Sequence, residues 1–498
     1  MKELLALTAH ELMAKFAAGE VKPAEFCETQ LGFAAQVEPK VKSFITLAEP
    51  GKSAAAAKVQ SHKKGARKLS QIPVSVKDCI ITRGFPTTAG SRVLAGYTPP
   101  YNATAVQHLL DAGNFLIGKT NLDEFAMGSS TENSAYHVTH NPWDLTRVPG
   151  GSSGGAAASV AALQSVVALG TDTGGSVRQP SGFCGVVGFL PSYGFVSRRG
   201  LIAFVSSLDQ ISVVARDVTD VALALNTIAR PDPLDATSCA PLDADFLRMA
   251  EDRASVEECT IGVVRQLMGD EVDAEVRALC EESVRILERV GCTIKWVDLP
   301  MVDKLLACYY VLCPAEVSSN LARYDGVRYG AGFPADTTLG LQEQYRKVRT
   351  PGFGEEVKRR ILLGTYVLSA GYAEQYYNQA RRVRYAVAQA VAQRFQEVDF
   401  LLTPTSPTPA FKLGERIQDP VALYLSDLCT VLANLASIPA VSLPAWLSKA
   451  GLPVGVQLMA PRGEDGRLLA VARLYEEAAG MKYQMPPLIA EELAGFTG

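Results

Sequence analysis

The stretch that decides the fold runs from residue 149 to residue 178 and reads PGGSSGGAAASVAALQSVVALGTDTGGSVR. Two clusters of glycine and serine flank one apolar segment, residues 156–170. Glycines at this density let backbone N–H groups approach a bound atom closely, which favours an anion-binding pocket. Ser152, Ser153 and Ser176 lie in these clusters and are therefore candidate nucleophiles. The simpler interpretation is a pair of flexible turns around a buried helix, but such turns rarely need two clusters beside one packed element.

The composition is that of a globular protein. Of the 498 residues, 48% are hydrophobic and 20% are charged, which is too apolar for a disordered chain. The net charge of -4 and the isoelectric point near 5.9 argue against a chain that itself binds nucleic acid or an anionic membrane. We expect three short basic clusters on solvated helix faces: Lys63, Lys64, Arg67 and Lys68; Lys358, Arg359 and Arg360; Arg381, Arg382 and Arg384.

The ten cysteines indicate a reducing compartment, because they are scattered and none forms a C-x-x-C pair. The N-terminus carries acidic residues early and lacks an apolar core, so it does not resemble a signal peptide. The apolar run 156–170 is too short to span a bilayer. These features predict a soluble cytoplasmic protein.

Helical and strand patterns alternate along the chain, which predicts an α/β layered sheet. The capping-box pattern Thr8–Glu11 opens a helix to about residue 18. We expect one large domain over 1–498, with an N-terminal helical segment at about 1–65 and a surface excursion at about 231–245. Further helices are expected at 53–64, 104–112, 153–169, 273–290 and 374–396, and strands at 72–82, 115–118, 260–264, 293–297 and 400–403.

No histidine follows the serine clusters in the sequence, so the usual order of a serine nucleophile and a later histidine base is not possible. All five lie before the serine clusters, so a Ser-His-Asp order with histidine last is excluded: His10, His62, His108, His137 and His140. His137 and His140 form an H-x-x-H pattern without a metal-binding frame, and we expect a structural role and no metal.

A lysine can replace histidine as the base. Lys77 lies in the apolar strand pattern VSVKD, where burial favours the neutral amine. Lowering a lysine pKa from about 10.4 to about 7 or 8 costs roughly 4 kcal/mol, which desolvation can supply. The residues alone leave open a lysine that reaches solvent or pairs with Asp78.

Five segments together resemble the amidase signature family: PVSVKD at 73–78, GGSSGG at 150–155, DTGGSVRQP at 172–180, FCGVVG at 183–188 and SSLDQ at 206–210. The candidate residues are spaced as in that family, with 152 − 77 = 75 and 176 − 152 = 24 residues between them. The resemblance implies an amide-hydrolysing enzyme with an α/β fold, in which helices cover both faces of a central mixed β-sheet.

The resemblance also implies roles for individual residues. Ser176 would be the nucleophile, Ser152 the bridging serine and Lys77 the base, with a cis peptide between Gly151 and Ser152. Ser153 and Asp172 would support Lys77 and Ser152. The oxyanion would meet the backbone N–H groups of Thr173, Gly174, Gly175 and Ser176.

Residues 309–330, 353–361, 424–427 and 433–436 resemble one branch of the family, the A (glutaminase) subunits of glutamyl-tRNA(Gln)/aspartyl-tRNA(Asn) amidotransferases. Free glutamine is a zwitterion, so its pocket needs a cation and an anion. The resemblance places Arg360 at the carboxylate and Asp427 at the ammonium, with Tyr309 lining the pocket. Arg359 is the alternative to Arg360.

Partners follow from the same resemblance. Ammonia would pass to a B subunit that uses ATP and Mg²⁺ and carries most of the contact with misacylated tRNA. A small helical C subunit would complete a heterotrimer, and this chain would hold no cofactor. Whether glutaminyl-tRNA, asparaginyl-tRNA or both are made is left open.

Other interpretations are a stand-alone amidase acting on small amides and a scaffold subunit without activity. GNFLIGKT at 113–120 matches the phosphate-loop pattern, but its interior reads as strand and a helix precedes it. GGSSG at 150–154 matches the α/β-hydrolase elbow, but no good strand pattern precedes it.

Overall fold

The computed structural model describes residues 1–49, 67–241, 245–329, 338–480 and 483–497, so the helix expected at 53–64 lies outside the described residues. Eleven strands form one mixed sheet in the order β1-β3-β2-β4-β6-β5-β10-β11-β9-β7-β8. The strands are β1 Phe44–Leu47, β2 Pro73–Lys77, β3 Phe115–Thr120, β4 Val167–Asp172, β5 Val187–Leu190, β6 Gln210–Ala215, β7 Thr260–Val264, β8 Thr293–Val297, β9 Phe400–Pro404, β10 Ala440–Leu447 and β11 Pro453–Met459.

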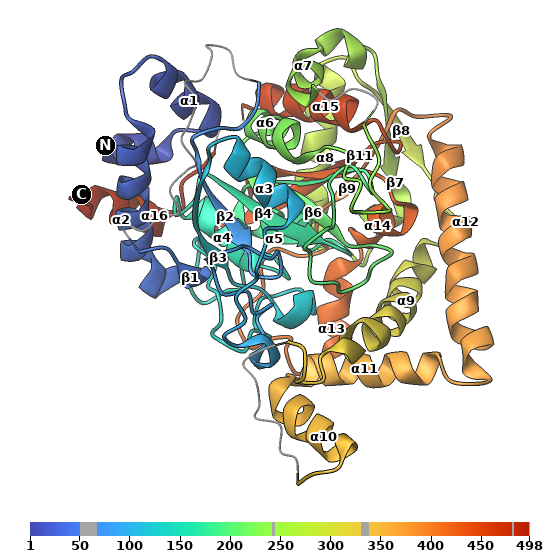
Figure 1. Ribbon diagram of the computed structural model, residues 1–498. Helices are drawn as coiled ribbons and strands as arrows, with labels where there is room; N and C mark the ends of the chain where they lie inside the picture. Colours follow the sequence, from blue (N-terminus) through green and yellow to red (C-terminus); the bar gives the residue numbers. More distant parts are fainter. Residues whose placement is uncertain (50–66, 242–244, 330–337, 481–482, 498) are drawn as a thin grey trace.

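Helices cover both faces of the sheet, as the α/β interpretation predicts (Figure 1). The α-helices are α1 Ala9–Ala17, α2 Pro23–Val41, α3 Thr104–Asp111, α4 Gly154–Ala161, α5 Arg178–Cys184, α6 Val218–Ile228, α7 Phe246–Glu251, α8 Ala274–Arg289, α9 Leu305–Asn320, α10 Leu341–Gly352, α11 Glu355–Val367, α12 Asn378–Arg394, α13 Pro420–Tyr424, α14 Val431–Ala436, α15 Asp465–Ala478 and α16 Pro487–Gly495. No helix within the described residues is long and apolar enough to cross a membrane.

The sheet brings the two sequence motifs to one edge. β2 pairs in parallel with β3 on one side and with β4 on the other. Parallel strands end at the same edge of a sheet, which is where α/β proteins commonly bind ligands. Lys77 is the last residue of β2, and Asp172 is the last residue of β4. The apolar strands thus place the ends of both motifs side by side.

Two expected elements are shorter than the sequence patterns suggested. The strand expected at 72–82 ends at Lys77, because the chain turns there and Ile80 N donates to Lys77 O at 2.9 Å. The helix expected at 153–169 covers only Gly154–Ala161. Leu163 takes a left-handed φ of 55°, and the β-branched residues that follow enter strand β4.

The other described elements agree with the sequence patterns. α1 carries the expected capping box, and α3, α8, β3, β7, β8 and β9 lie where expected within one or two residues. The helix expected at 374–396 begins as a π-helical turn, Ala373–Tyr377, and continues as α12. Residues 231–241 contain no helix or strand, and Leu234 is 67% exposed there. The single-domain organisation over 1–498 stays a prediction.

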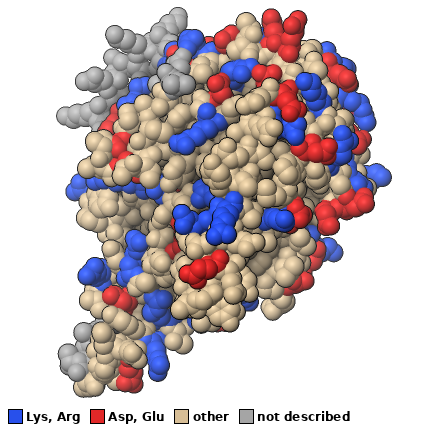
Figure 2. All heavy atoms as spheres, turned by 90° about the vertical axis from the view of Figure 1, so that its right-hand side faces the viewer, with Lys and Arg blue, Asp and Glu red and all other residues tan. Residues whose placement is uncertain are grey.

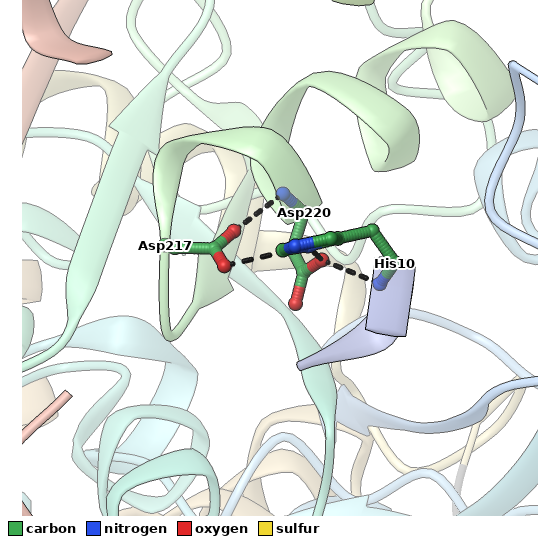
Figure 3. A group of neighbouring side chains, drawn as sticks. All are labelled: His10, Asp217 and Asp220. Carbon is green, nitrogen blue, oxygen red and sulfur yellow. Dashed lines mark hydrogen bonds and ion pairs between the residues drawn. The ribbon is translucent and has the colours of Figure 1, made fainter. Parts of the chain in front are cut away.

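The two ends of the chain lie together beside α1, α2 and α16 (Figure 1). Phe33 of α2 packs edge-on against Phe496, with ring centroids 5.3 Å apart. His10 of α1 reaches Asp217 and Asp220 at the start of α6, with its Nδ1 3.0 Å from Asp220 Oδ1 (Figure 3). Asp220 also accepts the backbone N–H of His10 at 2.9 Å, so its carboxylate ties the two helices together.

Acidic and basic side chains both occur over the face that includes α12 (Figure 2). The expectation that the basic clusters lie on solvated helix faces is wrong for two residues. Arg360 is buried, and the half-buried Arg384 donates to Ser207 Oγ at 3.0 Å. Both helices pack inward on these sides, because α11 and α12 contact α9. Arg359, Arg381 and Arg382 are exposed, as expected.

Candidate active site

Lys77 is fully buried, with its amine surrounded by hydroxyl groups. Its Nζ lies 2.7 Å from Ser152 Oγ, 2.8 Å from Ser153 Oγ and 2.8 Å from Thr171 Oγ1. Within the described chain, no carboxylate lies within ion-pair distance of this amine. Burial lowers the pKa of Lys77, which favours the neutral amine. The alternative of a lysine that pairs with Asp78 is wrong, because Asp78 pairs with Lys119 at 3.2 Å.

The first glycine-serine cluster presents Ser152 and Ser153 to that lysine. The peptide between Gly151 and Ser152 is cis, as the resemblance implied. Ser153 N donates to Ser176 O at 3.0 Å and so links the first cluster to the second. Ser153 Oγ donates to Thr171 O at 3.0 Å. The structure therefore brings the side chains of Lys77, Ser152, Ser153 and Thr171 together, with the backbone of Ser176 beside them.

Ser176 is the most exposed of the three predicted triad residues, at 9%, whereas Lys77 and Ser152 are at 0%. Its Oγ makes no hydrogen bond to Ser152 in the part of the chain that the structure describes. The exposure of Ser176 fits a nucleophile, because substrate must reach it. The missing bond to Ser152 fits an enzyme without substrate, in which catalytic hydrogen bonds are often longer.

Asp172 holds the turn that carries Ser176. It accepts the N–H of Gly175 at 2.9 Å and of Val177 at 3.2 Å. Its buried partner Arg178 donates to it with Nε and Nη2, each at 3.0 Å. Burial alone would raise the pKa of Asp172, but Arg178 and these donors lower it, so the carboxylate is charged. Asp172 therefore supports the turn rather than Lys77 by direct contact.

The predicted oxyanion donors need one correction. The N–H of Gly175 is aimed at Asp172 and is not available to a substrate oxygen. No hydrogen bond among the described residues engages the N–H groups of Thr173, Gly174 or Ser176. The Thr173 side chain is fixed separately, since its hydroxyl donates to Asp209 at 2.8 Å.

The residues predicted to bind substrate are buried beside this turn. A Cβ on Gly174 would lie 2.6 Å from Tyr309 Cζ, so the tyrosine ring rests directly on the turn. Asp427 accepts from Ser129 Oγ at 2.9 Å and from Tyr310 Oη at 2.7 Å. Burial raises its pKa to about 6. Thr430 joins this acid to the turn by donating to Gly174 O at 2.7 Å.

Arg360 rather than Arg359 is the buried arginine. The Arg360 side chain is 3% exposed and donates from Nε to Glu356 Oε1 at 2.7 Å. The Arg359 side chain is 42% exposed and pairs with the other oxygen of Glu356. Arg360 is thus a buried cation paired with the buried Glu356, and Asp427 is a buried carboxyl group without a cationic partner among its hydrogen bonds.

Residues 25–469 match the family described as Amidase. The chain belongs to the amidase family. This amidase is 50% identical over 490 residues to the A subunit of the glutamyl-tRNA(Gln) amidotransferase from Rubrobacter xylanophilus, and the match covers 97% of this chain and 100% of the relative. It is 48% identical over 489 residues to the protein of the same name from Myxococcus xanthus, with 98% and 100% covered.

Solved structures agree with the fold of this amidase. The A subunit of the glutamyl-tRNA(Gln) amidotransferase from Thermotoga maritima matches with a TM-score of 0.80 and 40% identity, over 97% of this chain and 98% of that chain. A peptide amidase of Stenotrophomonas maltophilia matches with a TM-score of 0.78 and 26% identity, over 98% and 99%. The fold is therefore shared with enzymes that differ in their named reactions.

The other motifs that the sequence analysis singled out, the H-x-x-H pattern and the phosphate-loop match, have structural roles in this amidase. His137 Nε2 lies 2.9 Å from Phe44 O, and His140 Nδ1 lies 2.6 Å from Leu145 O. The phosphate-loop match coincides with the buried strand β3. Its lysine, Lys119, is buried against Asp78 and donates to Ile80 O at 2.8 Å, so it faces no phosphate pocket.

Sequence reasoning missed several residues of the site. Thr171 is the third hydroxyl at the lysine, and its place beside the second cluster was a usable signal. Arg178 lies within the quoted DTGGSVRQP motif, but its inward direction depends on α5. Ser129 lay outside the quoted motifs. Tyr310 and Glu356 lie within the quoted segments 309–330 and 353–361, but their roles were missed because their contacts join segments far apart in the chain.

Proposed function

We propose that this chain is the glutaminase subunit of a tRNA-dependent amidotransferase, which hydrolyses the side-chain amide of glutamine and delivers ammonia to a partner. The single observation that carries the proposal is a buried Lys77 amine that contacts Ser152 and has no carboxylate partner among the described residues. Full-length relatives named as the A subunits of glutamyl-tRNA(Gln) amidotransferases support it.

The hydrogen bonds around Lys77 fit a neutral base. Ser153 gives its one hydroxyl proton to Thr171 O, so it can only accept from the amine. A neutral amine has two N–H donors and one lone pair. If it donates to Ser153 and to Thr171, its lone pair faces Ser152. Lys77 is then placed to take a proton from Ser152.

In the proposed reaction, Ser152 passes its proton to Lys77 as it accepts the proton of Ser176. Ser176 Oγ attacks the amide carbon, and the oxyanion meets the free N–H groups of the turn, such as that of Gly174. The relay runs back to protonate the leaving nitrogen, which departs as ammonia. Water, deprotonated through the same path, releases glutamate and restores Ser176.

The pocket favours a zwitterionic substrate. The Arg360 guanidinium would bind the α-carboxylate of glutamine, and the Asp427 carboxylate its α-ammonium. Tyr309, packed on Gly174, would guide the side-chain amide toward Ser176. A neutral small amide would make neither of these contacts and would therefore bind more weakly. This asymmetry favours glutamine hydrolysis over a stand-alone amidase of small amides.

The partners belong to the same proposal. Ammonia would pass to a B subunit, which uses ATP and Mg²⁺ to activate misacylated tRNA and carries most of the tRNA contact. A small helical C subunit would complete a cytoplasmic heterotrimer. The pI near 5.9 fits a subunit that leaves most tRNA contact to its partner.

The test is glutamate and ammonia release by the complex of co-produced subunits. We expect Lys77→Met, Ser152→Ala and Ser176→Ala each to lower kcat by at least about a thousandfold. The matched control is Ser159→Ala, a buried serine of α4 that bonds Ala156 O, and it should retain activity. Arg360→Ala should mainly raise KM. A Lys77→Met or Ser176→Ala enzyme with parental kcat would refute the proposal.

A further inference from the structure

The two charged residues of the pocket are connected through side chains outside the predicted substrate contacts. Tyr310 Oη donates to Asp427 Oδ2 at 2.7 Å, and its ring stacks on Tyr424, with centroids 3.9 Å apart and planes 19° apart. Tyr424 Oη donates to Glu356 Oε1 at 2.8 Å. The same oxygen accepts from Arg360 Nε at 2.7 Å. A continuous path thus runs from the acid to the cation.

The path joins three segments that are distant in sequence. Tyr310 lies on α9, Glu356 and Arg360 lie on α11, and Tyr424 ends α13 three residues before Asp427. The Arg360 guanidinium also lies against both rings, 5.5 Å from the Tyr310 centroid and 5.4 Å from the Tyr424 centroid. The stacked tyrosines therefore separate the cation from the acid and set the distance between them.

Glu356 engages Arg360 in a way that leaves donors for a ligand. Glu356 accepts from Arg360 Nε, while Arg360 Nη1 has only Cys313 Sγ as a partner, at 3.9 Å. Nη2 has no hydrogen-bond partner among the described residues. A guanidinium anchored through Nε keeps its two Nη groups for a carboxylate.

We propose that Tyr310 and Tyr424 are positioning residues, which fix the spacing of Asp427 and Arg360 and thereby select an amide that carries both an α-ammonium and an α-carboxylate. The inference rests on the proposed glutaminase function. It assigns a specificity role to side chains that do not themselves perform the chemistry.

The pH dependence of kcat/KM reports the pKa of Asp427, and it would not change if Tyr310 had only a structural role. The groups that face it are Tyr310 and Tyr309 from α9, Ser129, Arg360 from α11 and Asp172 from β4. Burial raises its pKa to about 6, and the Tyr310 and Ser129 hydrogen bonds and the Arg360 charge oppose that rise. Removal of the Tyr310 hydroxyl therefore moves the acid limb of kcat/KM to higher pH.

The experiment compares Tyr310→Phe and Tyr424→Phe with the parent in the complex of co-produced subunits. Each substitution keeps the ring and removes one hydroxyl. Tyr475→Phe is the matched control, because Tyr475 is an internal tyrosine away from this path, with its Oη 2.9 Å from Ser283 Oγ on α8. Substrates are glutamine and glutaramate, which retains the carboxylate and the amide but lacks the ammonium.

For glutamine we expect Tyr310→Phe to raise KM about tenfold with kcat changed less than about twofold, since a bond to a buried charged group is lost. For glutaramate the effect should vanish, and the acid limb should shift only with glutamine. Tyr424→Phe should raise KM for both substrates through Arg360, and Tyr475→Phe should change neither.

The inference would be overturned if Tyr310→Phe and Tyr424→Phe both hydrolysed glutamine with kcat and KM within twofold of the parent values. Equal losses of Tyr310→Phe on glutamine and glutaramate would also overturn it. If Tyr310→Phe does not fold, the Tyr424→Phe arm decides. A parent complex that fails to hydrolyse glutamine would refute the proposed function instead, so the two failures are distinguishable.

Discussion

Lys77 is the residue on which the proposed chemistry depends. It is fully buried, three hydroxyls surround its amine, and burial lowers its pKa. The neutral form is therefore present at lower pH than for a lysine in water. Such an amine can act as a base near neutral pH without a histidine.

The pH dependence of kcat tests this directly. A base must be unprotonated, so kcat should fall as pH falls through the lowered pKa of Lys77 and reach a plateau above it. Lys77→Arg keeps a positive charge that cannot be removed, and it should lower kcat by at least about a thousandfold at every pH. Initial rates between pH 5 and pH 9 measure both. A Lys77→Arg enzyme with the parental kcat would contradict the assignment of the base.

Gly174 has no room for a side chain. A Cβ there would lie 2.6 Å from Tyr309 Cζ and 2.7 Å from its Oη. Gly174→Ala should therefore displace the tyrosine and the turn, and we expect kcat/KM for glutamine to fall about tenfold or more, as overpacking typically costs 1–3 kcal/mol. Gly269→Ala is the control, because its Cβ would meet only Gln266 O at 3.3 Å. Equal kinetics for the two variants would contradict this view of the pocket.

Residue chemistry was the part of the site that the sequence could predict. The lysine, the serines and the glycine turn lie in short motifs, so their types and order are visible in the chain. Tyr310 and Glu356 lie in quoted segments, but their contacts could not be predicted, because these form only after α9, α11 and α13 pack together. The engaged N–H of Gly175 depends likewise on how the Asp172 side chain folds back on its own turn.

At the scale of elements, His10 ties α1 to α6 (Figure 3). Burial lowers its pKa, but the hydrogen bond to Asp220 and the charges of Asp217 and Asp220 outweigh burial and raise the pKa to about 9. Because the folded pKa exceeds the unfolded value of about 6.5, the tether stabilises the protein fully below about pH 6.5. This stabilisation is lost as pH rises through about 9.

We therefore expect the Tm difference between the parent and His10→Gln to be largest near pH 6 and to shrink toward pH 9.5. Thermal unfolding across that range measures it. Parallel Tm curves would show that His10 does not titrate with folding.

Element boundaries were harder to predict than element types. Most strands and helices fell where hydrophobic periodicity placed them, but the helix expected at 153–169 ran into β4. Residues 156–170 are apolar throughout, so periodicity could not separate a buried helix from a buried strand. The prediction that the basic cluster 358–360 lies on a solvated helix face was wrong for Arg360 for a related reason, because composition does not tell which arginine of a helix faces inward.

At the scale of the whole molecule, the two ends of the chain close on each other. Phe496, after α16, packs against Phe33 of α2 and is 8% exposed. Phe496→Ala should lower the free energy of unfolding by about 2–4 kcal/mol, within the range for large-to-small changes. Leu362→Ala, at a side chain 71% exposed, should change it little. Chemical denaturation of the complex checks both.

Glutaminase kinetics of Phe496→Ala at 25 °C should match the parent, because Phe496 packs on Phe33 of α2. A large loss of kcat at that temperature with intact folding would mean that the terminal helices act on the site. The overall order of the eleven strands could not be predicted from the sequence, since it depends on long-range pairing, such as β5 with β10.

The buried Arg178 has a consequence for the order in which the protein is made. Its acceptors include Asp172, Thr430 O, Asn434 and Gln457, so they extend over more than half of the chain. Translation releases the amino-terminal part first. A nascent polypeptide still attached to the ribosome at residue 400 already contains the three residues of the proposed triad, but its Arg178 lacks most of these acceptors. The turn that carries Ser176 can thus gain this full set of contacts only after residue 457 has been made.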